Sequence, residues 1–270
     1  MGINKNLYRK DLHRNRRGLF IWGAILLGIT VMFTAIFPLM SGMQDVMGTA
    51  MEEFYGEDMT SSMGMDQMFS DILSFYSTYY SIYIILLFCI YNAVTATGII
   101  AKEERNHTSE FLYVKPITRA DVFWSKFLVM LTNLGVIFVL QSGVALLCIQ
   151  LFKTTEVSMS TFAAMHFHGL IIALFFSCVG LFISIFMRPK KSFMGVVLGL
   201  IFGMLILDAI SKMADAVNFL GYISPFHYLG LQISDENFGF NTIPAIVFIA
   251  LSVTLVVLAL NKFKKKDILG

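Results

Sequence analysis

The sequence is poor in charged residues, in cysteine and in nucleotide-binding motifs. Only 14% of its 270 residues are charged, whereas soluble domains contain about a quarter. Its three cysteines each lie within an apolar stretch, where a thiol behaves as a small hydrophobic group, so no disulfide framework is expected. No G-x-x-x-x-G-K-[ST] phosphate-binding loop occurs. These shortages argue against a soluble enzyme or an ATPase.

Apolar residues make up the difference, with 57% hydrophobic residues and a mean hydropathy of +0.73. A helix needs roughly 20 apolar residues to cross the hydrocarbon of a bilayer. Six stretches meet this need, and their long unalternating runs are not barrel strands. We therefore predict an all-α integral membrane protein, a single domain over 1–270, with transmembrane helices at about 19–41, 75–101, 122–152, 161–187, 193–211 and 242–261. The first is too long for a signal-peptide core and no small-residue cleavage site follows it, so we expect it to remain as an anchor.

The basic residues predict the orientation of these spans. With a cytoplasmic N-terminus, 18 of the 20 lysines and arginines fall on the cytoplasmic side, and only Lys153 and Lys212 fall outside. Of the 18 acidic residues, 12 fall outside. Because cytoplasmic loops carry the excess of Lys and Arg, we predict that both termini are cytoplasmic in a cell membrane. The basic clusters adjoin span ends, so membrane lipid is an expected partner and nucleic acid is not.

Two segments outside the spans predict short helices. Residues 4–17 place Leu7, Tyr8 and Leu12 near one face among cations, which favours an N-terminal helix in the inner interface, with a solvated basic tail as the alternative. Residues 216–241 hold glycines and a proline among apolar residues. We expect short outer-leaflet helices there, before the last span.

The longest connection, 42–74, contains seven acidic residues and no Lys or Arg. Its methionines recur at helical spacing at Met43, Met47 and Met51, and we expect helical extensions of the first two spans that join near Gly56. Methionine surfaces adapt to varied apolar partners and carboxylates attract cations, so this region is a candidate part of a substrate path. Flexible packing between helices and soft-metal handling are the alternatives.

A cytoplasmic connection, 102–126, is the most informative stretch. Thr108 can cap a short helix that Pro116 ends, and Thr118 with Asp121 three residues on is typical of a capping box that starts the next span. The product is a short helix held nearly parallel to the membrane. An ordinary structured turn between spans is the alternative.

This connection resembles that of the type 2 permeases of ABC transporters, approximately Glu-Arg-x-x-Gly-Thr-x-Glu-x-Leu-x-x-x-Pro-x-Ser-Arg and then Lys. The matching positions are Glu103, Thr108, Glu110, Leu112, Pro116, Thr118, Arg119 and Lys126. Glu104 and His107 depart from the pattern, where Arg and Gly are common. The stretch 224–228 and the turn 184–192 are also similar to the family's.

The resemblance implies that the connection is a coupling helix that docks on a separate ATPase subunit. Two permease chains, by expectation a homodimer, and two ATPase subunits would form the exporter, with ATP and Mg bound by the ATPase and no cofactor bound by this chain. The coupling residues would be Glu103, Glu104, Thr108, Glu110, Phe111, Leu112, Pro116 and Arg119. The outer region suggests an amphipathic or cationic peptide, or a hydrophobic antimicrobial, as cargo.

Polar residues inside spans are costly and often mark a substrate path. The candidates are Asn92, Thr95, Thr97, Gln141 and Asp208. Hydrogen bonds between helices are the alternative for the first three. Asp208 can pair with Lys212, four residues on, as an ion pair at the outer interface.

Other classes of function find less support. Catalysis needs a base, a nucleophile or a metal set within reach, and the spans offer one clear carboxylate, Asp208. His166 and His168 are two positions apart and point in different directions on a helix, so no metal site is expected. A non-transporting membrane sensor or immunity subunit of similar build remains an open alternative.

Overall fold

The computed structural model describes residues 2–42, 46, 49–50, 53–54, 56, 71–105, 117–153, 156–186, 193–213, 215–233 and 238–265. Within these ranges every regular element is a helix: α1 (Lys5–Ser41), α4 (Ile72–Tyr79), the π-helical η1 (Tyr80–Ile84), α5 (Ile85–Arg105), α7 (Arg119–Phe152), α8 (Met159–Phe186), α9 (Phe193–Ser211), the 3₁₀-helical η2 (Asp215–Ile223), α10 (Pro225–Tyr228) and α11 (Thr242–Lys265). The all-α prediction is confirmed.

Six helices are long and apolar enough to cross a membrane, as predicted, with α4, η1 and α5 running on as one of them. The predicted span 193–211 coincides with α9, and the others lie within their helices or end one residue beyond them. Helices extend past the apolar stretches because polar caps, not hydropathy, set several of their ends. Asn4 caps α1, Asp71 caps α4 and Thr118 caps α7 through side-chain oxygens.

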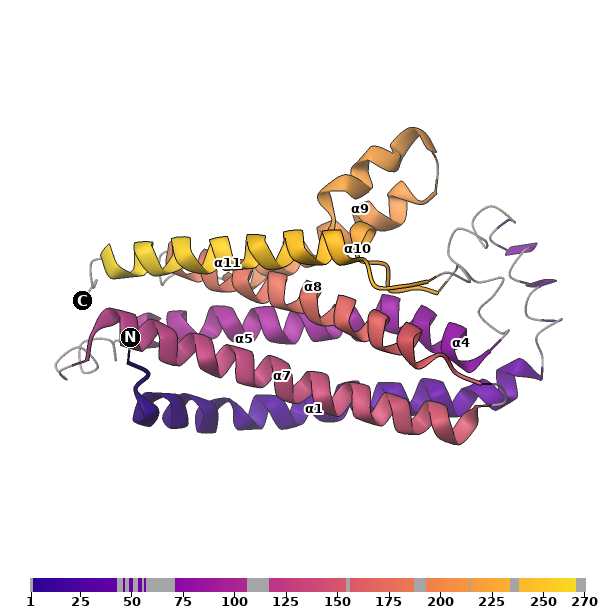
Figure 1. Ribbon diagram of the computed structural model, residues 1–270, viewed down its shortest axis with the longest axis horizontal. Helices are drawn as coiled ribbons and strands as arrows, with labels where there is room; N and C mark the ends of the chain where they lie inside the picture. The colour runs from indigo at the N-terminus through magenta and orange to yellow at the C-terminus, as the bar shows by residue number, and fades with distance from the viewer. Residues whose placement is uncertain are drawn as a thin grey trace.

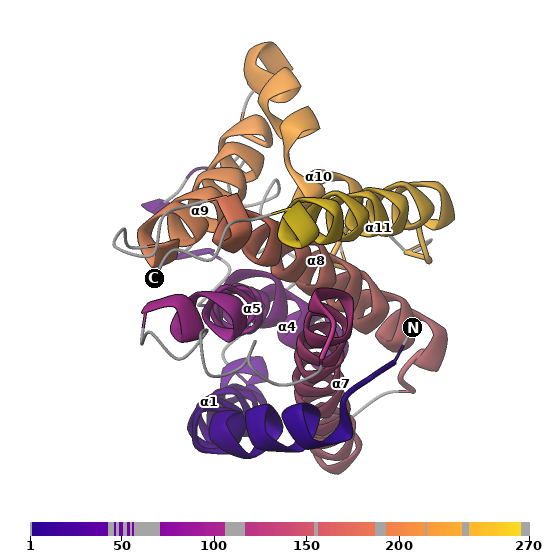
Figure 2. The ribbon, with the colours of Figure 1, turned by 90° about the vertical axis from the view of Figure 1, so that its left-hand side faces the viewer.

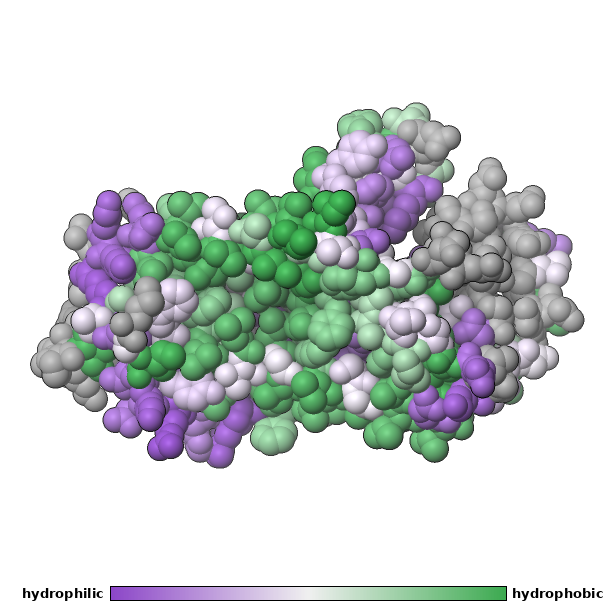
Figure 3. Space-filling model, viewed as in Figure 1, coloured by the Kyte–Doolittle hydropathy of each residue, from purple (hydrophilic) through white to green (hydrophobic). Residues whose placement is uncertain are grey.

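The helices form an elongated bundle in which the start of α1 and the end of α11 lie at the same end (Figure 1). α5 packs on α8, α1 on α7 and α11 on α8. In the most apolar stretch of each span, 56% and 61% is buried for the second and fourth spans but 22% for the first and fifth. The second and fourth spans are therefore central, while α1 and α9 are peripheral. An apolar belt crosses the middle of the bundle, and hydrophilic residues gather at both ends (Figure 3).

The N-terminal helix expected at 4–17 is not a separate element but the first part of α1. Its turns run across the end of the bundle before α1 turns along it (Figure 2). Leu7 and Asp11 on this part are buried. The segment is therefore packed onto the bundle and is not a solvated tail.

Two short helices, η2 and α10, precede the last span, as predicted. The C-terminal part of α9 and the whole of η2 form a hairpin that extends away from the other helices (Figure 1). Gly56 has a φ of +84°, a conformation that favours glycine and fits the predicted turn. Met43, Met47 and Met51 lie outside the described residues.

Candidate coupling site

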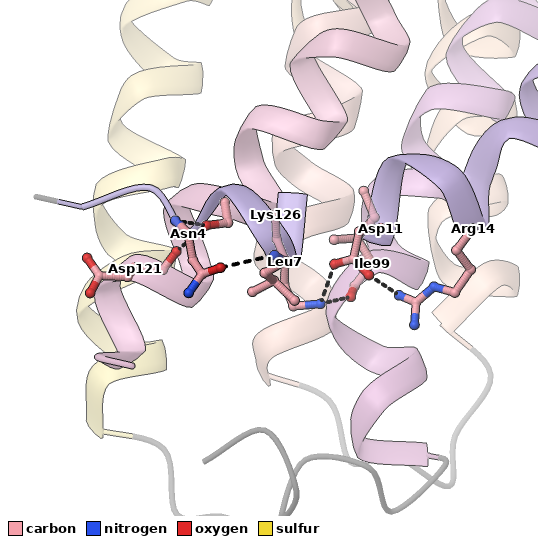
Figure 4. A network of polar contacts seen from close by, with 8 residues as sticks. Asn4, Leu7, Asp11, Arg14, Ile99, Asp121 and Lys126 are labelled. Atoms are coloured by element: carbon pink, nitrogen blue, oxygen red, sulfur yellow. Dashed lines mark hydrogen bonds and ion pairs between the residues drawn. The ribbon is translucent and has the colours of Figure 1, made fainter. Parts of the chain in front are cut away.

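Three helices meet around a buried ion pair at the end of the bundle where α1 begins and α11 ends. The Lys126 ammonium, on α7, donates to Asp11 Oδ2 on α1 at 3.1 Å and to the Ile99 carbonyl on α5 at 2.8 Å (Figure 4). Asp11 is 0% and Lys126 1% exposed. Arg14, with a side chain 33% exposed, pairs with Asp11 Oδ1 at 3.0 Å. One cluster of charges thus ties α1, α5 and α7 together.

This cluster, Asp11, Arg14, Lys126 and the Ile99 carbonyl, holds the three helices firmly for an electrostatic reason. Removing a single ion from water costs several kcal/mol, which only a well-placed opposite charge and further hydrogen bonds offset. Lys126 therefore cannot leave Asp11 while it stays buried. The position of the start of α7 is linked to those of α1 and the end of α5.

The segment before α1 adds a second attachment to α7. The Gly2 N–H donates to Asp121 Oδ1 and the Asn4 N–H to Ser125 Oγ, both at 2.9 Å. The Thr118 hydroxyl donates to Asp121 Oδ2 at 2.6 Å, and its oxygen accepts from the Asp121 N–H, which confirms Thr118 as the cap of α7. The first residues of the chain therefore follow the first turns of α7.

The residues predicted to couple to an ATPase lie at the end of α5, at the start of α7 or outside the described ranges. Glu103 and Glu104 are in the last turn of α5, where the structure describes the backbone but not the side chains. Arg119 is the first residue of α7, and its guanidinium donates to the Lys264 carbonyl at 3.1 Å, which connects α7 to α11. The others lie outside the described residues: Thr108, Glu110, Phe111, Leu112 and Pro116.

Deeper in the bundle, a chain of buried hydrogen bonds joins four helices. Gln141 on α7 donates from Nε2 to Thr30 Oγ1 on α1 at 2.8 Å and to the Tyr76 hydroxyl on α4 at 3.3 Å. The Tyr76 hydroxyl is 3.1 Å from His166 Nε2 on α8, and His166 Nδ1 is 2.9 Å from the Phe162 carbonyl. Every member is neutral when Nδ1 carries the proton, and each donor then has an acceptor.

A comparison with known protein families identifies the family of this chain. Residues 5–268 match the family described as ABC-2 family transporter protein. The chain belongs to the ABC-2 transporter family. It is thus a multi-pass permease component of an ABC transporter, a transport subunit and not itself catalytic. No match was found among curated proteins.

None of the residues of the buried cluster was among the predicted sites of this permease. Asp11 is the one acidic residue in the first 18, and its helical spacing from Leu7 places a carboxylate on the apolar face, which is the signal that would have identified it. The sequence identified Lys126 only as a match to the permease connection and as one of the basic residues on the cytoplasmic side. Their pairing joins positions 115 apart, and no periodic pattern predicts such a contact.

The polar residues predicted within the permease's second span behave differently from Gln141. Asn92 is buried and donates from Nδ2 to the Phe88 carbonyl at 2.8 Å, and the Thr97 hydroxyl donates to the Ala93 carbonyl. In the described part of the chain these bonds run within α5, so neither residue shows the bond between helices that was the alternative to a substrate-path role. Each side chain reaches the carbonyl one turn earlier on its own helix. Thr95 is partly buried.

His166 and His168 of the permease face different elements, as their spacing predicts. His168 Nδ1 is 2.8 Å from the Gly230 carbonyl, and Nε2 accepts from the Asn241 N–H at 2.9 Å. His168 therefore holds the segment before α11 against α8. Among the described residues, no three His, Cys, Asp or Glu side chains are grouped so as to hold a metal ion.

Replacing Gln141 with leucine is expected to destabilise the permease by about 1–2 kcal/mol. The change leaves the buried Tyr76 hydroxyl without its donor from α7 and breaks the link to Thr30. Thermal unfolding in detergent measures the loss. Ser142→Ala is the matched control, since the Ser142 hydroxyl bonds to the Phe138 carbonyl of its own helix. Equal stability of the two variants would show that the chain does not hold the helices together.

Proposed function

We propose that this permease couples to a separate ATPase subunit through residues 103–119, in an exporter of two permease chains and two ATPase subunits. The observation that supports this most directly is the buried cluster around Lys126. It joins the last turns of α5 to the first turns of α7, and these are the helices that flank the predicted coupling segment. A force applied to that segment acts first on the two helices that Lys126 connects.

The cluster also offers a route from the coupling segment to the rest of the bundle. Because Lys126 and Asp11 stay paired while buried, displacement of the start of α7 displaces the first part of α1. Further along the same two helices, Gln141 bonds to Thr30, so α1 and α7 are joined at two levels. Closure of the ATPase subunits would then move α1 and α7 as one unit.

The charge distribution supports cytoplasmic termini for this exporter. Six spans bring the start of α1 and the end of α11 to one end of the bundle (Figure 1), and the sequence assigns that end 18 of its 20 basic residues. The ATPase, with its ATP and Mg, would lie on that side. The acidic, methionine-rich region 42–74 supports an amphipathic or cationic peptide, or a hydrophobic antimicrobial, as the exported cargo.

The two least buried spans support a second permease chain as partner. α1 and α9 each bury 22% of their most apolar stretch within this chain, which leaves apolar faces for lipid or for another copy. A homodimer through these faces would place the cargo path between two copies.

Replacing Phe111 with aspartate is expected to abolish co-purification of the ATPase with the permease. A carboxylate in place of an apolar docking side chain would have to enter the ATPase groove unpaired, which costs several kcal/mol. The measurement is the amount of ATPase recovered with tagged permease from detergent-solubilised membranes. Glu110→Lys should act in the same direction.

His13→Asp is the matched control, because His13 is exposed on the first part of α1 at the same end of the bundle. It introduces the same charge without touching the coupling segment, and full ATPase recovery is expected. Undiminished recovery with Phe111→Asp would contradict docking through 103–119.

A further inference from the structure

A pocket of about 300 Å³ lies between η1, the end of α9 and the residues that follow η2. Its walls are mostly apolar and include Ile82, Leu205, Phe226 and Leu231, and an ion pair of Asp208 and Lys212 lines it as well. The volume is at the lower limit of ligand pockets, which measure about 300–1,000 Å³. It admits one alkyl chain with a small polar head.

The ion pair leaves both of its charges partly unsatisfied. Lys212 Nζ donates to Asp208 Oδ2 at 2.9 Å, as predicted from their spacing. The Asp208 side chain is only 8% exposed, and within the described residues its buried Oδ1 accepts no hydrogen bond, with His227 Nδ1 3.6 Å away. The Lys212 side chain is 45% exposed. An anion can therefore reach Lys212, and a cation can approach the small part of the Asp208 carboxylate that is exposed.

Tight packing builds the site before any ligand binds. A Cβ at Gly221 on η2 would lie 2.5 Å from His227 Nδ1 and 2.6 Å from Ser211 Oγ, so only glycine allows this approach. The Ser211 hydroxyl in turn donates to the Asp208 carbonyl at 2.7 Å. The opposite wall belongs to η1, and π-helical turns are frequent at functional sites. The charged end of the pocket is therefore held in place by its neighbours.

The position of the pocket matches the boundary between lipid tails and headgroups. Asp208 lies three residues before the end of α9, whose apolar stretch is Met194–Ser211. Ile82 and Ile206, which also line the pocket, are exposed apolar side chains. The hairpin of α9 and η2 shows hydrophilic residues on one side and hydrophobic residues on the other, next to the apolar belt (Figure 3). A lipid chain can thus enter from the side while its head reaches the ion pair.

We propose that this pocket binds one zwitterionic phospholipid with a primary ammonium headgroup, as a resident lipid of the permease. The ammonium pairs with the accessible part of the Asp208 carboxylate, and the phosphate accepts from Lys212 Nζ. One acyl chain lies against Leu205 and Phe226, and the other stays in the bilayer. A head with only one charge would satisfy Lys212 or Asp208 but not both, so the charge pattern selects a zwitterion.

The test is binding to the purified full chain in an uncharged maltoside detergent, measured by native mass spectrometry. Lysophosphatidylethanolamine is the probe, and lysophosphatidylglycerol, which lacks the ammonium, is the comparison. Asp208→Asn and Lys212→Met are each expected to weaken binding of the probe roughly tenfold or more, since each removes a charged hydrogen-bond partner. Leu205→Trp should abolish binding by filling the pocket while it leaves the ion pair in place.

The matched controls are Glu156→Gln and Lys153→Met, which make similar charge changes at exposed positions between α7 and α8. They should bind the probe like the unaltered chain. Probe binding unchanged by both Asp208→Asn and Leu205→Trp would overturn the site, and equally tight binding of lysophosphatidylglycerol would overturn its selectivity for a zwitterion.

The binding test contains neither ATPase nor nucleotide. Its failure would therefore not count against the proposed coupling of the permease to an ATPase. The assembled transporter separates a resident lipid from a cargo. Phosphatidylethanolamine that stimulates ATP hydrolysis in a manner abolished by Asp208→Asn would be a cargo, and this result would overturn the resident assignment. A rate of ATP hydrolysis that phosphatidylethanolamine does not stimulate, together with binding that depends on Asp208, supports the assignment as a resident lipid.

Discussion

Lys126→Met is expected to lower the free energy of unfolding of this permease by up to about 3–5 kcal/mol, because the buried Asp11 carboxylate then keeps only Arg14, whose side chain is 33% exposed, as a charged partner. Asp11 is fully buried, so water cannot replace the lost charge. The Ile99 carbonyl also loses a donor. Denaturation of the purified chain in detergent measures the loss, and we expect faster amide exchange in residues 5–17 as the first part of α1 detaches.

A second variant separates the ion pair from general damage to the fold. Asp11→Leu combined with Lys126→Met removes both charges, and apolar replacement of a buried pair is often neutral or stabilising. The double variant should therefore be more stable than Lys126→Met alone. Arg14→Gln, which removes a partner that is 33% exposed, should change the free energy by only about 0–1 kcal/mol. A double variant no better than the single one would mean that Lys126 acts by packing and not by charge.

Gly180→Ala is expected to destabilise the permease by about 1–3 kcal/mol, because it forces apart the two central spans. A Cβ at Gly180 on α8 would lie 2.7 Å from the Ala93 carbonyl and 3.0 Å from Thr97 Oγ1, both on α5. The nearer atom is backbone, so it cannot move aside without shifting the helix. Small residues allow such close approach between membrane helices. Thermal unfolding in detergent gives the size of the effect.

A glycine-to-alanine substitution at a position with open space should not lower the stability of the permease. Gly199 on α9 has open space where a Cβ would be added, and alanine is favoured over glycine within a helix by up to about 1 kcal/mol. Gly199→Ala is therefore expected to be neutral or stabilising. If Gly180→Ala behaved in the same way, the close contact between α5 and α8 would not limit stability.

The sequence by itself predicted the six spans, the helical class and the permease family. Each span is a local property, since about 20 consecutive apolar residues must satisfy their backbone within one helix wherever the helix lies in the bundle. The Asp208–Lys212 pair was predictable for the same reason, because both residues lie on one helix four positions apart. The caps at Thr118 and Asp71 are also local, each formed by a side chain with amides two or three residues on.

Only the tertiary structure decided which polar groups meet. Lys126 pairs with Asp11 across 115 positions, and Gln141 reaches Thr30 across 111, because α1 and α7 pack side by side. Nothing periodic in either helix specifies that neighbour. The pocket at Asp208 likewise needs η1, α9 and α10 together. Hydropathy determines which segments enter the membrane, whereas the fit of their side chains determines which helices touch, and the sites of this permease depend on that fit.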